Sequence, residues 1–523
     1  MSAVAQVEED FETAYVVDSV GDMPTTFKSA MESNNAVKWK EACDSEIDSL
    51  RKNKTCQLVR LPKDRKTIGC RWVFRVKENQ DSGIERFKAR LVAKGFSQKF
   101  GIDYGETFAP VAKFTSIRVI LSLADKYHLD VHQIIVKTAF LNGDLDVDSY
   151  MEQLDGYIDE DHEHFVCKLQ RSLYGLKESP RMWNKTIDKF MIKIGFKKCE
   201  SDCCICIKRG EQRMIFVALC IDDLIIASNS NKILREAKSA LSERFEMTYM
   251  GMLKFFLGIE IERDDLGGKL SLRQNKFSKD ILEKFGMLNS NSVGSPQDPG
   301  LKLTKAMCEG GCKHEETMAS FPYRNAVGCL VYLMVGTRPD LAAAVGVLSQ
   351  FASEPCPTHW QALKRIFRYV NGTRTNGIKF QASEDDSLQG YSDADWDGDI
   401  ESRRSTSSYA FIMNNSRISW RSKKQRKVAL SSREAEYMDL SEATQEAVWL
   451  RVFLCELGEM TSNQAVKIFE DNQGSIALAK NPEFHKRMKH IDIRYHFARE
   501  KVAEGQVVLG YCPTKDKNAD MMT

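Results

Sequence analysis

Two adjacent aspartates, Asp222 and Asp223, interrupt an apolar run that extends from Val217 to Ala227. Adjacent carboxylates repel each other and aspartate is a poor strand residue, so the run is not expected to continue as one buried strand. We expect the two apolar arms to pair as a β-hairpin with the acidic pair at its tip. A divalent metal would offset the repulsion there, and paired metals about 3.5–4 Å apart are typical of nucleotidyl transfer. An Asp-Asp turn in an ordinary hairpin is the alternative that this segment leaves open.

The chain has 523 residues, which is too long for one domain and predicts three or four compact units. Its formal net charge of +2 says nothing about partners, but the basic residues are clustered. Residues 60–99 contain twelve Lys or Arg against four Asp or Glu, and residues 417–433 contain seven basic side chains and no acidic one. Such patches suit contacts with phosphate groups, although a single charge run is more often a solvated surface.

Fifteen cysteines are scattered along the chain, and neither a signal peptide nor a stretch long enough to span a bilayer is visible. We therefore expect free thiols and an intracellular location. Two groups could be metal ligands: Cys199, Cys203, Cys204 and Cys206, and Cys308, Cys312 and His314. Neither group has a second ligand pair at the spacing of a zinc site, so plain thiols are the favoured interpretation.

Several elements can be placed from the spacing of apolar residues. Residues 39–50 carry apolar side chains at helical spacing among charges, which predicts an amphipathic helix. Residues 71–77 and 87–94 alternate as strands around a turn, giving a hairpin with basic side chains on one face. Residues 289–314 are rich in Gly, Ser, Pro and Cys and form the best linker candidate, and a new βα unit begins at Gln389.

Six short motifs occur in a fixed order around the acidic pair. They are Arg71-Trp-Val-Phe74, Lys88-Ala-Arg-Leu-Val-Ala-Lys-Gly95, Thr107-Phe-Ala-Pro-Val111, Val136-Lys-Thr-Ala-Phe-Leu-Asn-Gly143, Ser172-Leu-Tyr-Gly-Leu-Lys177 and Gly336-Thr-Arg-Pro-Asp340. The series resembles the reverse transcriptase and RNase H region of Pol polyproteins from copia-type LTR retrotransposons. The resemblance covers roughly residues 25–523. One motif would be a weak signal, whereas the ordered series is a strong one.

The resemblance implies an α+β fold in which a right-hand polymerase is followed by a helical connection and an α/β RNase H-like domain. The implied segments are an acidic flexible arm (1–24), fingers and palm (25–245), primer grip and thumb (246–288), linker and helical connection (289–388), and the RNase H-like domain (389–523).

In the polymerase part, the resemblance implies catalytic and metal-binding roles for Asp222 and Asp223. It also implies four substrate-binding residues: Lys88 and Arg90 beside the incoming triphosphate, Phe140 under the deoxyribose, and Lys177 below the template-primer. Fixed cations near a triphosphate offset charge during phosphoryl transfer. Taken alone, the two basic residues could instead serve strand-edge solubility, and Phe140 could be a core aromatic.

Ile135 departs from the family pattern, in which the strand before the Phe140 motif ends with an aspartate that completes the metal triad. Isoleucine cannot coordinate Mg²⁺, which requires oxygen ligands. Loss of such a group should cost many powers of ten in rate. We therefore expect the polymerase fold to survive with severely impaired DNA synthesis. Two milder departures are Cys220 in place of Tyr and Glu178 in place of Gln, the latter adding a negative charge near template phosphate.

A second set of acidic residues lies in the C-terminal part. Four segments are similar to elements of an RNase H domain: Tyr391–Trp396, Ser431–Tyr437, Ile468–Gln473 and Lys515–Asp520. The resemblance implies four catalytic metal ligands: Asp393, Glu436, Asp471 and Asp520. His490 is a weaker candidate for product release or proton transfer, and residues 421–427 would border the hybrid groove. Any single acid could instead cap a helix or occupy a turn.

The implied activity is RNA-directed DNA synthesis coupled to degradation of the RNA strand, with two Mg²⁺ ions in each active site. The implied partners are an RNA template, a DNA primer, their hybrid and dNTPs, with no membrane and with a possible homodimer or contacts to other Pol parts. The expected location is a cytoplasmic particle or the nucleus. Two alternatives remain: a nuclease that only cleaves the hybrid, and a non-catalytic nucleic-acid-binding relic.

Overall fold

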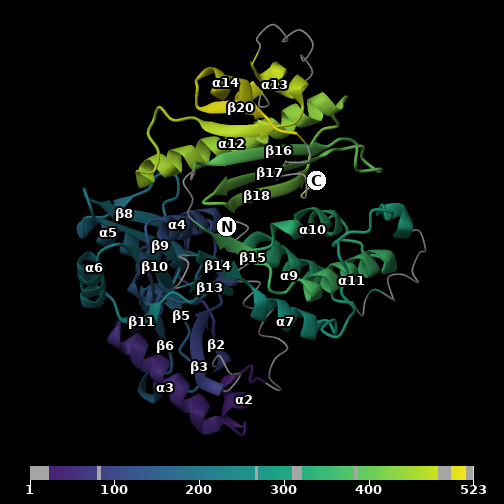
Figure 1. Cartoon of the computed structure of the whole chain (residues 1–523). Coiled ribbons are helices and arrows are strands. Elements are labelled where there is room, and N and C mark those ends of the chain that lie inside the picture. Colours follow the sequence, from purple (N-terminus) through teal and green to yellow (C-terminus); the bar gives the residue numbers. More distant parts are fainter. Residues whose placement is uncertain are drawn as a thin grey trace. The chain divides into compact units, whose positions relative to one another are not determined.

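The computed structural model of the chain describes residues 23–78, 84–264, 269–308, 318, 321–381, 387–480, 496–513 and 522. The chain divides into two compact units (Figure 1). The first comprises Met1–Ala112, His132–Lys198 and Cys203–Gly251, and the second comprises Lys113–Val131, Cys199–Asp202 and Met252–Thr523. The described helices and strands form the mixed α+β fold expected from the sequence. Among the described residues, no helix combines the length and apolar character needed to cross a bilayer.

A six-stranded sheet carries the acidic pair. Its strand order is β11 (Met247–Met252), β4 (Asp130–Val136), β10 (Asp223–Ser228), β9 (Met214–Cys220), β8 (Ile205–Arg209) and β7 (Lys197–Lys198). Almost every residue of β9 and β10 is buried, as expected for central strands covered on both faces. Asp223 pairs with Cys220 in an antiparallel register, so the predicted hairpin with the acidic pair at its tip is confirmed. The helices that follow β6 and β10 along the chain are α5 (Ser179–Lys193) and α6 (Asn231–Arg244).

The rest of the first unit is built on smaller sheets. The basic hairpin of β2 (Cys70–Glu78) and β3 (Ile84–Ala93) packs on α3 (Ala36–Lys52). The apolar stripe of α3 is buried as predicted, and the Trp39 ring lies 4.6 Å from the Phe87 ring. The remaining elements are the sheet β1 (Cys56–Arg60), β6 (Phe165–Arg171) and β5 (Asp144–Met151), the helix α2 (Phe27–Met31), and the short helices η1 (Gly95–Ser97), η2 (Ala139–Asn142) and η3 (Glu160–His162).

The second unit contains a four-stranded sheet and several helices. The strands, in order, are β12 (Phe255–Phe256), β13 (Ile259–Asp264), β14 (Lys269–Arg273) and β15 (Gly377–Phe380). The helices are α4 (Phe114–Lys126), α7 (Asn275–Lys284), η4 (Lys305–Cys308), α9 (Tyr323–Gly336), η5 (Pro339–Leu341), α10 (Ala342–Ser349) and α11 (Pro357–Gly372). Arg338, which lies between α9 and η5, is buried and forms an ion pair of 2.7 Å with Asp340.

A five-stranded mixed sheet completes the second unit. Its order is β18 (Ser416–Lys424), β17 (Thr406–Met413), β16 (Gln389–Asp395), β19 (Val466–Glu470) and β20 (Val507–Tyr511). Neighbours among β16, β17 and β18 pair antiparallel, whereas β19 pairs parallel with both β16 and β20. The 26-residue helix α12 (Ser432–Leu457) packs across β16 (Figure 1). Between β19 and β20 the chain forms α13 (Gln473–Lys480) and α14 (Phe497–Ala503).

Arg118 of α4 is buried within the second unit. Its guanidinium donates to the carbonyl of Ile418 at 2.7 Å and to that of Val335 at 2.8 Å, and it lies 3.9 Å from the centre of the Trp420 ring. Burial lowers the pKa of Arg118 to about 9. These contacts satisfy carbonyl groups at the end of α9 and in β18, so Arg118 ties α4 to both elements.

We expect Arg118→Met to lower the free energy of unfolding by about 3 kcal/mol, because several buried carbonyls would lose their donors. Denaturant unfolding followed by circular dichroism measures this change. Arg235→Met on the exposed surface of α6 is the matched control and should change stability by less than about 0.5 kcal/mol. Equal stability of the two variants would contradict the structural role of Arg118.

Candidate functional site

The tip of the acidic hairpin (residues 214–228) is held from two sides. Ile221 and Asp222 form the turn, and Ile221 has a positive φ of 53°, a conformation that is strained for a β-branched residue. The indole N–H of Trp183 in α5 donates to the carbonyl of Ile221 at 2.7 Å. The backbone N–H of Val136 in β4 donates to the carbonyl of Asp222 at 2.8 Å. The tip is therefore fixed by α5 and by the end of β4.

A chain of contacts starts at this tip and includes three residues predicted from the sequence. A guanidinium nitrogen of Arg90 lies 3.7 Å from a carboxylate oxygen of Asp222, and both side chains are partly exposed. The Arg90 guanidinium lies 4.4 Å from the centre of the Tyr174 ring, which in turn lies 4.8 Å from the Phe140 ring. Arg90 therefore contacts Asp222 directly, and the Tyr174 ring connects Arg90 to Phe140. Lys88 lies two residues before Arg90 on β3, which places it on the same face of that strand.

Tyr174 and Trp183 are site residues that sequence reasoning missed. The position of Tyr174 inside the Ser172–Lys177 motif was the available signal. Its loop lies close against β3, because the N–H of Ala93 donates to the Tyr174 carbonyl at 2.8 Å. The next residue, Gly175, has a φ of +89°, and a Cβ there would lie 2.2 Å from the Ala93 carbonyl oxygen. Only glycine fits this approach, which positions the Tyr174 ring beside Arg90.

Lys177 and Glu178 both contact the segment 98–104. The Lys177 ammonium donates to the Gln98 carbonyl at 3.1 Å and to the Tyr104 hydroxyl at 3.3 Å. The Glu178 carboxylate is 5% exposed and accepts a bond of 3.0 Å from the Gln98 side chain. Burial is the main cause of the raised pKa of Glu178. The expectation that Glu178 presents a negative charge to template phosphate is therefore corrected, because protein atoms enclose its carboxylate.

The surroundings of the acidic pair include the position that Ile135 occupies. Ile135 directly precedes Val136, whose N–H bonds to Asp222, so an apolar side chain stands at the strand end beside the acidic pair. Within the described part of the chain, neither Asp222 nor Asp223 belongs to a group of three metal-ligand side chains whose donor atoms lie within 4.8 Å of one another. Magnesium needs oxygen ligands in near-octahedral geometry. At this tip the chain offers the carboxylates of Asp222 and Asp223.

A second group of carboxylates, here called the acidic cluster, consists of Asp393, Glu436 and Asp471. One ligand atom from each lies within 4.8 Å of the others. The parallel pairing of β16 with β19 sets Tyr391 opposite Phe469, so Asp393 and Asp471 follow at the same level of the sheet. Glu436 comes from the second turn of α12, which packs across β16. Asp520, the predicted fourth ligand, and His490 lie outside the described residues.

Buried polar groups support the acidic cluster from behind. The Ser392 hydroxyl donates to a carboxylate oxygen of Glu470 at 2.8 Å, which joins the ends of β16 and β19. Asp393 and Glu436 are each 7% exposed, and Asp471 is half-buried. Asp395 lies outside this buried group, at the exposed end of β16, where desolvation and then the charge of Asp393 raise its pKa. The cluster offers oxygen donors in a field of negative charge, so the residues present fit a divalent cation.

Asp439, one helical turn after Glu436, is a buried acid that sequence reasoning also missed. It is completely buried, and neither carboxylate oxygen has a hydrogen-bond partner among the described residues. Burial raises its pKa well above the ordinary value, and the charges of Glu436 and Glu470 act in the same direction. The i,i+3 spacing from Glu436 was the one signal available in the sequence.

We expect Asp439→Ala to raise the free energy of unfolding at pH 8 by about 2 kcal/mol, because an uncompensated buried carboxylate is removed. The folded-state pKa of Asp439 is raised above the unfolded value, so its contribution to stability is present below about pH 4 and is lost as the pH rises through the folded pKa. The gain should therefore be larger at pH 8 than at pH 5. Urea unfolding in EDTA at both values measures it. The exposed Asp48→Ala is the control, and a gain independent of pH would contradict the assignment.

The predicted groove residues 421–427 include five basic side chains. Arg421 lies 3.5 Å from Glu442, and Lys424 lies 2.6 Å from Asp399. Lys423, Arg426 and Lys427 are exposed. The two cysteine-containing groups considered from the sequence differ in how far the structure describes them. In the first group, Cys199, Cys204 and Cys206 are buried and Cys203 is partly buried. In the second group, Cys312 and His314 lie outside the described residues.

Comparison with known proteins gives the class of the acidic hairpin and its surroundings. Residues 53–299 match the family model described as "Reverse transcriptase (RNA-dependent DNA polymerase)". The hairpin with its acidic tip and the basic β3 strand both lie inside this match, so residues 53–299 are similar to the reverse transcriptase family.

The wider chain matches transposon proteins. It is 43% identical over 512 residues to the retrovirus-related Pol polyprotein from transposon TNT 1-94 of Nicotiana tabacum, covering 98% of this chain and 38% of that protein. It is 40% identical over 499 residues to the Pol polyprotein from transposon RE2 of Arabidopsis thaliana, covering 95% of this chain and 33% of that protein. It is 30% identical to putative transposon Ty5-1 protein YCL074W of Saccharomyces cerevisiae, covering 60% of this chain and 99% of that protein.

The chain belongs to the copia-type retrotransposon Pol family, which confirms the family inferred from the six motifs and its reverse transcriptase region. It spans between a third and two fifths of the length of the first two Pol polyproteins.

Proposed function

We propose that this chain is the polymerase and nuclease part of a retrotransposon Pol protein, and that it cleaves the RNA strand of an RNA–DNA hybrid at the acidic cluster. One observation carries the proposal: Asp393, Glu436 and Asp471 come from three separate elements, and their ligand atoms lie within 4.8 Å of one another. Surface carboxylates repel each other and have no reason to converge in a buried position, whereas metal-dependent hydrolysis requires such convergence.

The carboxylates of the cluster share one task in this proposal, and neighbouring contacts hold them in place. Asp393, Glu436 and Asp471, together with Asp520, would hold Mg²⁺, which supplies a water of lowered pKa and stabilises charge on the phosphate. The bond between Ser392 and Glu470 keeps the ends of β16 and β19 together, and the packing of α12 on β16 fixes Glu436. The site is thereby assembled before substrate arrives, which lowers the cost of binding the metal and the phosphate.

In the same proposal, the polymerase centre at Asp222 and Asp223 has a reduced rate of DNA synthesis. Asp222 and Asp223 would bind metal, Arg90 and Lys88 would face the triphosphate of an incoming dNTP, and Phe140 would lie under its sugar. Lys177 would support the template-primer through the segment 98–104. Ile135 removes the third oxygen donor, so DNA synthesis on an RNA template is severely impaired in this chain.

A paired assay on one RNA–DNA hybrid tests the proposal. The hybrid carries a labelled DNA primer and a differently labelled RNA strand, and primer extension and RNA cleavage are measured with and without Mg²⁺. We expect Mg²⁺-dependent cleavage and weak extension. Binding without cleavage would overturn the proposal in favour of a non-catalytic nucleic-acid-binding relic, and robust extension would overturn the assignment of Ile135.

A further inference from the structure

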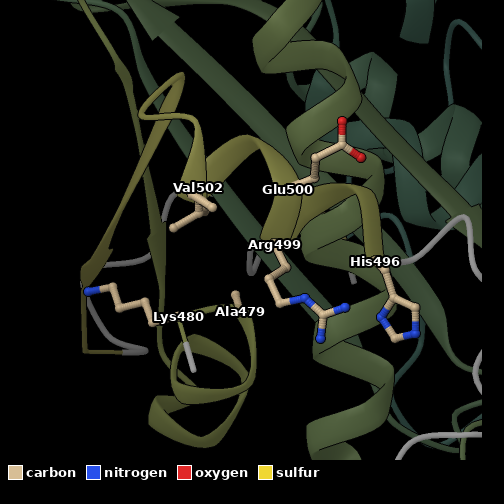
Figure 2. A pocket seen from close by; sticks show the side chains of 7 residues that line it. Ala479, Lys480, His496, Arg499, Glu500 and Val502 are labelled. Carbon is tan, nitrogen blue, oxygen red and sulfur yellow. The ribbon is translucent and has the colours of Figure 1, made fainter. Parts of the chain in front are cut away.

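A pocket of about 460 Å³ lies between α13 and α14 in the second unit. Its lining includes Ala479 and Lys480 at the end of α13, and His496, Arg499, Glu500 and Val502 in and just before α14 (Figure 2). Three of these side chains carry nitrogen donors, and none of them has a role in the proposed reaction so far.

The charge of the pocket is positive on the side of Arg499. Figure 2 shows the Arg499 guanidinium and the His496 ring extending to one side of α14, while the Glu500 carboxylate points to the other. Glu500 is also paired outside the pocket, because one of its oxygens lies 3.2 Å from the Lys501 ammonium. The Lys480 ammonium donates to the Leu509 carbonyl at 3.3 Å and points away from the Arg499 guanidinium (Figure 2), so its positive charge acts on the pocket from a greater distance.

The pocket adjoins the acidic cluster through two short connections. The hydroxyl of Tyr437, the residue after Glu436, lies 3.4 Å from Nδ1 of His496. Burial raises the pKa of this hydroxyl, and the charge of Arg499 acts on it in the opposite direction. Along the other connection, α13 begins two residues after Asp471 and ends at Lys480. Eight helical residues span about 12 Å, which corresponds to roughly three or four nucleotides at about 3.4 Å per step.

We propose that this pocket binds a backbone phosphate of the nucleic acid a few nucleotides from the bond that is cut at the acidic cluster. The inference rests on the proposed nuclease function and adds a substrate contact to it. Arg499 and His496 donate to the phosphate oxygens, and Lys480 contributes charge. A fixed phosphate contact positions a strand without reading its sequence, which suits an enzyme that must cut at many sites.

Neutral linkages in the substrate test the contact directly. The full chain is titrated, in metal-free buffer so that no cleavage occurs, with labelled RNA–DNA hybrids that each carry one uncharged methylphosphonate linkage. Fluorescence anisotropy gives the dissociation constant for each position. We expect one position to weaken binding by the unchanged chain about tenfold, as loss of a charge-assisted hydrogen bond does.

The same scan is repeated with Arg499→Gln. In this variant the sensitive position should disappear, and the slope of log K against log salt should fall by about one phosphate contact. Lys480→Gln should reduce the loss of affinity caused by the neutral linkage at the same position. Because this variant keeps Arg499, it distinguishes loss of the phosphate contact from a folding defect caused by replacing Arg499. Lys467→Gln is the matched control, because Lys467 is exposed on β19 and does not line the pocket.

If the dissociation constants depend on the position of the neutral linkage in the same way for the unchanged chain and for Arg499→Gln, the pocket does not contact the nucleic-acid backbone. That result would also cover a pocket that binds only free phosphate. If the unchanged chain still binds and cleaves the hybrid in that case, the proposed nuclease function survives. Failure of the unchanged chain to bind any hybrid would overturn both.

Discussion

Asp471→Asn is expected to lower Mg²⁺-dependent cleavage of the RNA strand by about a thousandfold or more, as the loss of a central catalytic group does. The change keeps the size of the side chain and removes one negative ligand from the acidic cluster, so folding should be preserved. The measurement is the initial rate of RNA cleavage in a hybrid under substrate excess, with circular dichroism to verify the fold.

Asp395→Asn is the matched control for this variant. Asp395 lies two residues beyond Asp393 at the exposed end of β16 and is not part of the acidic cluster, yet its replacement removes the same charge. We expect its cleavage rate to stay within about threefold of the unchanged chain, as for a group outside the machinery. Retained cleavage in Asp471→Asn would show that the cluster is not the catalytic centre, and an equal loss in both variants would indicate a general effect of charge.

Ile135→Asp is expected to increase primer extension by about a hundredfold or more, because it returns an oxygen donor to the strand end beside Asp222. The N–H of Val136 already bonds to the Asp222 carbonyl, so the new carboxylate would come from the residue adjacent to a fixed contact. Ile135 is only partly buried, which makes the polar replacement tolerable. Single-nucleotide extension on an RNA template with Mg²⁺ measures the gain.

Ile135→Asn separates charge from shape in this experiment. Asparagine has the size of aspartate without its negative charge, so its extension rate should rise far less than that of Ile135→Asp. Strong extension by the unchanged chain would contradict the assigned defect. A well-folded Ile135→Asp without any gain would show that another departure, such as Cys220 in β9, limits the polymerase centre.

Local patterns in the sequence were sufficient for part of this architecture. The repulsion between Asp222 and Asp223 predicted a hairpin tip, and the register of Asp223 with Cys220 agrees with it. The interaction that controls this tip is local. Asp393 and Asp471 are instead implied by the family resemblance, and the parallel pairing of β16 with β19 brings the two residues to the same level of the sheet.

Other features depend on contacts between distant parts of the chain. The burial of Glu178 is set by Gln98, eighty residues earlier, and nothing near Glu178 signals that partner. Asp439 is buried because α12 packs against β16, and a helical pattern alone gives no reason to place an acid there. The link from Arg90 to Tyr174 likewise requires the close approach of the Tyr174 loop to β3 at Gly175. Tertiary packing decides such positions, so sequence reasoning passes over them.

The helix α4 gives the two units an interleaved order along the chain. Residues 113–131 belong to the second unit, although the residues on either side of them belong to the first. A fragment that starts at residue 252 would therefore lack α4 and leave the carbonyls of Ile418 and Val335 without the guanidinium of Arg118. No single proteolytic cut can release either unit intact, because each unit is assembled from segments that alternate along the chain.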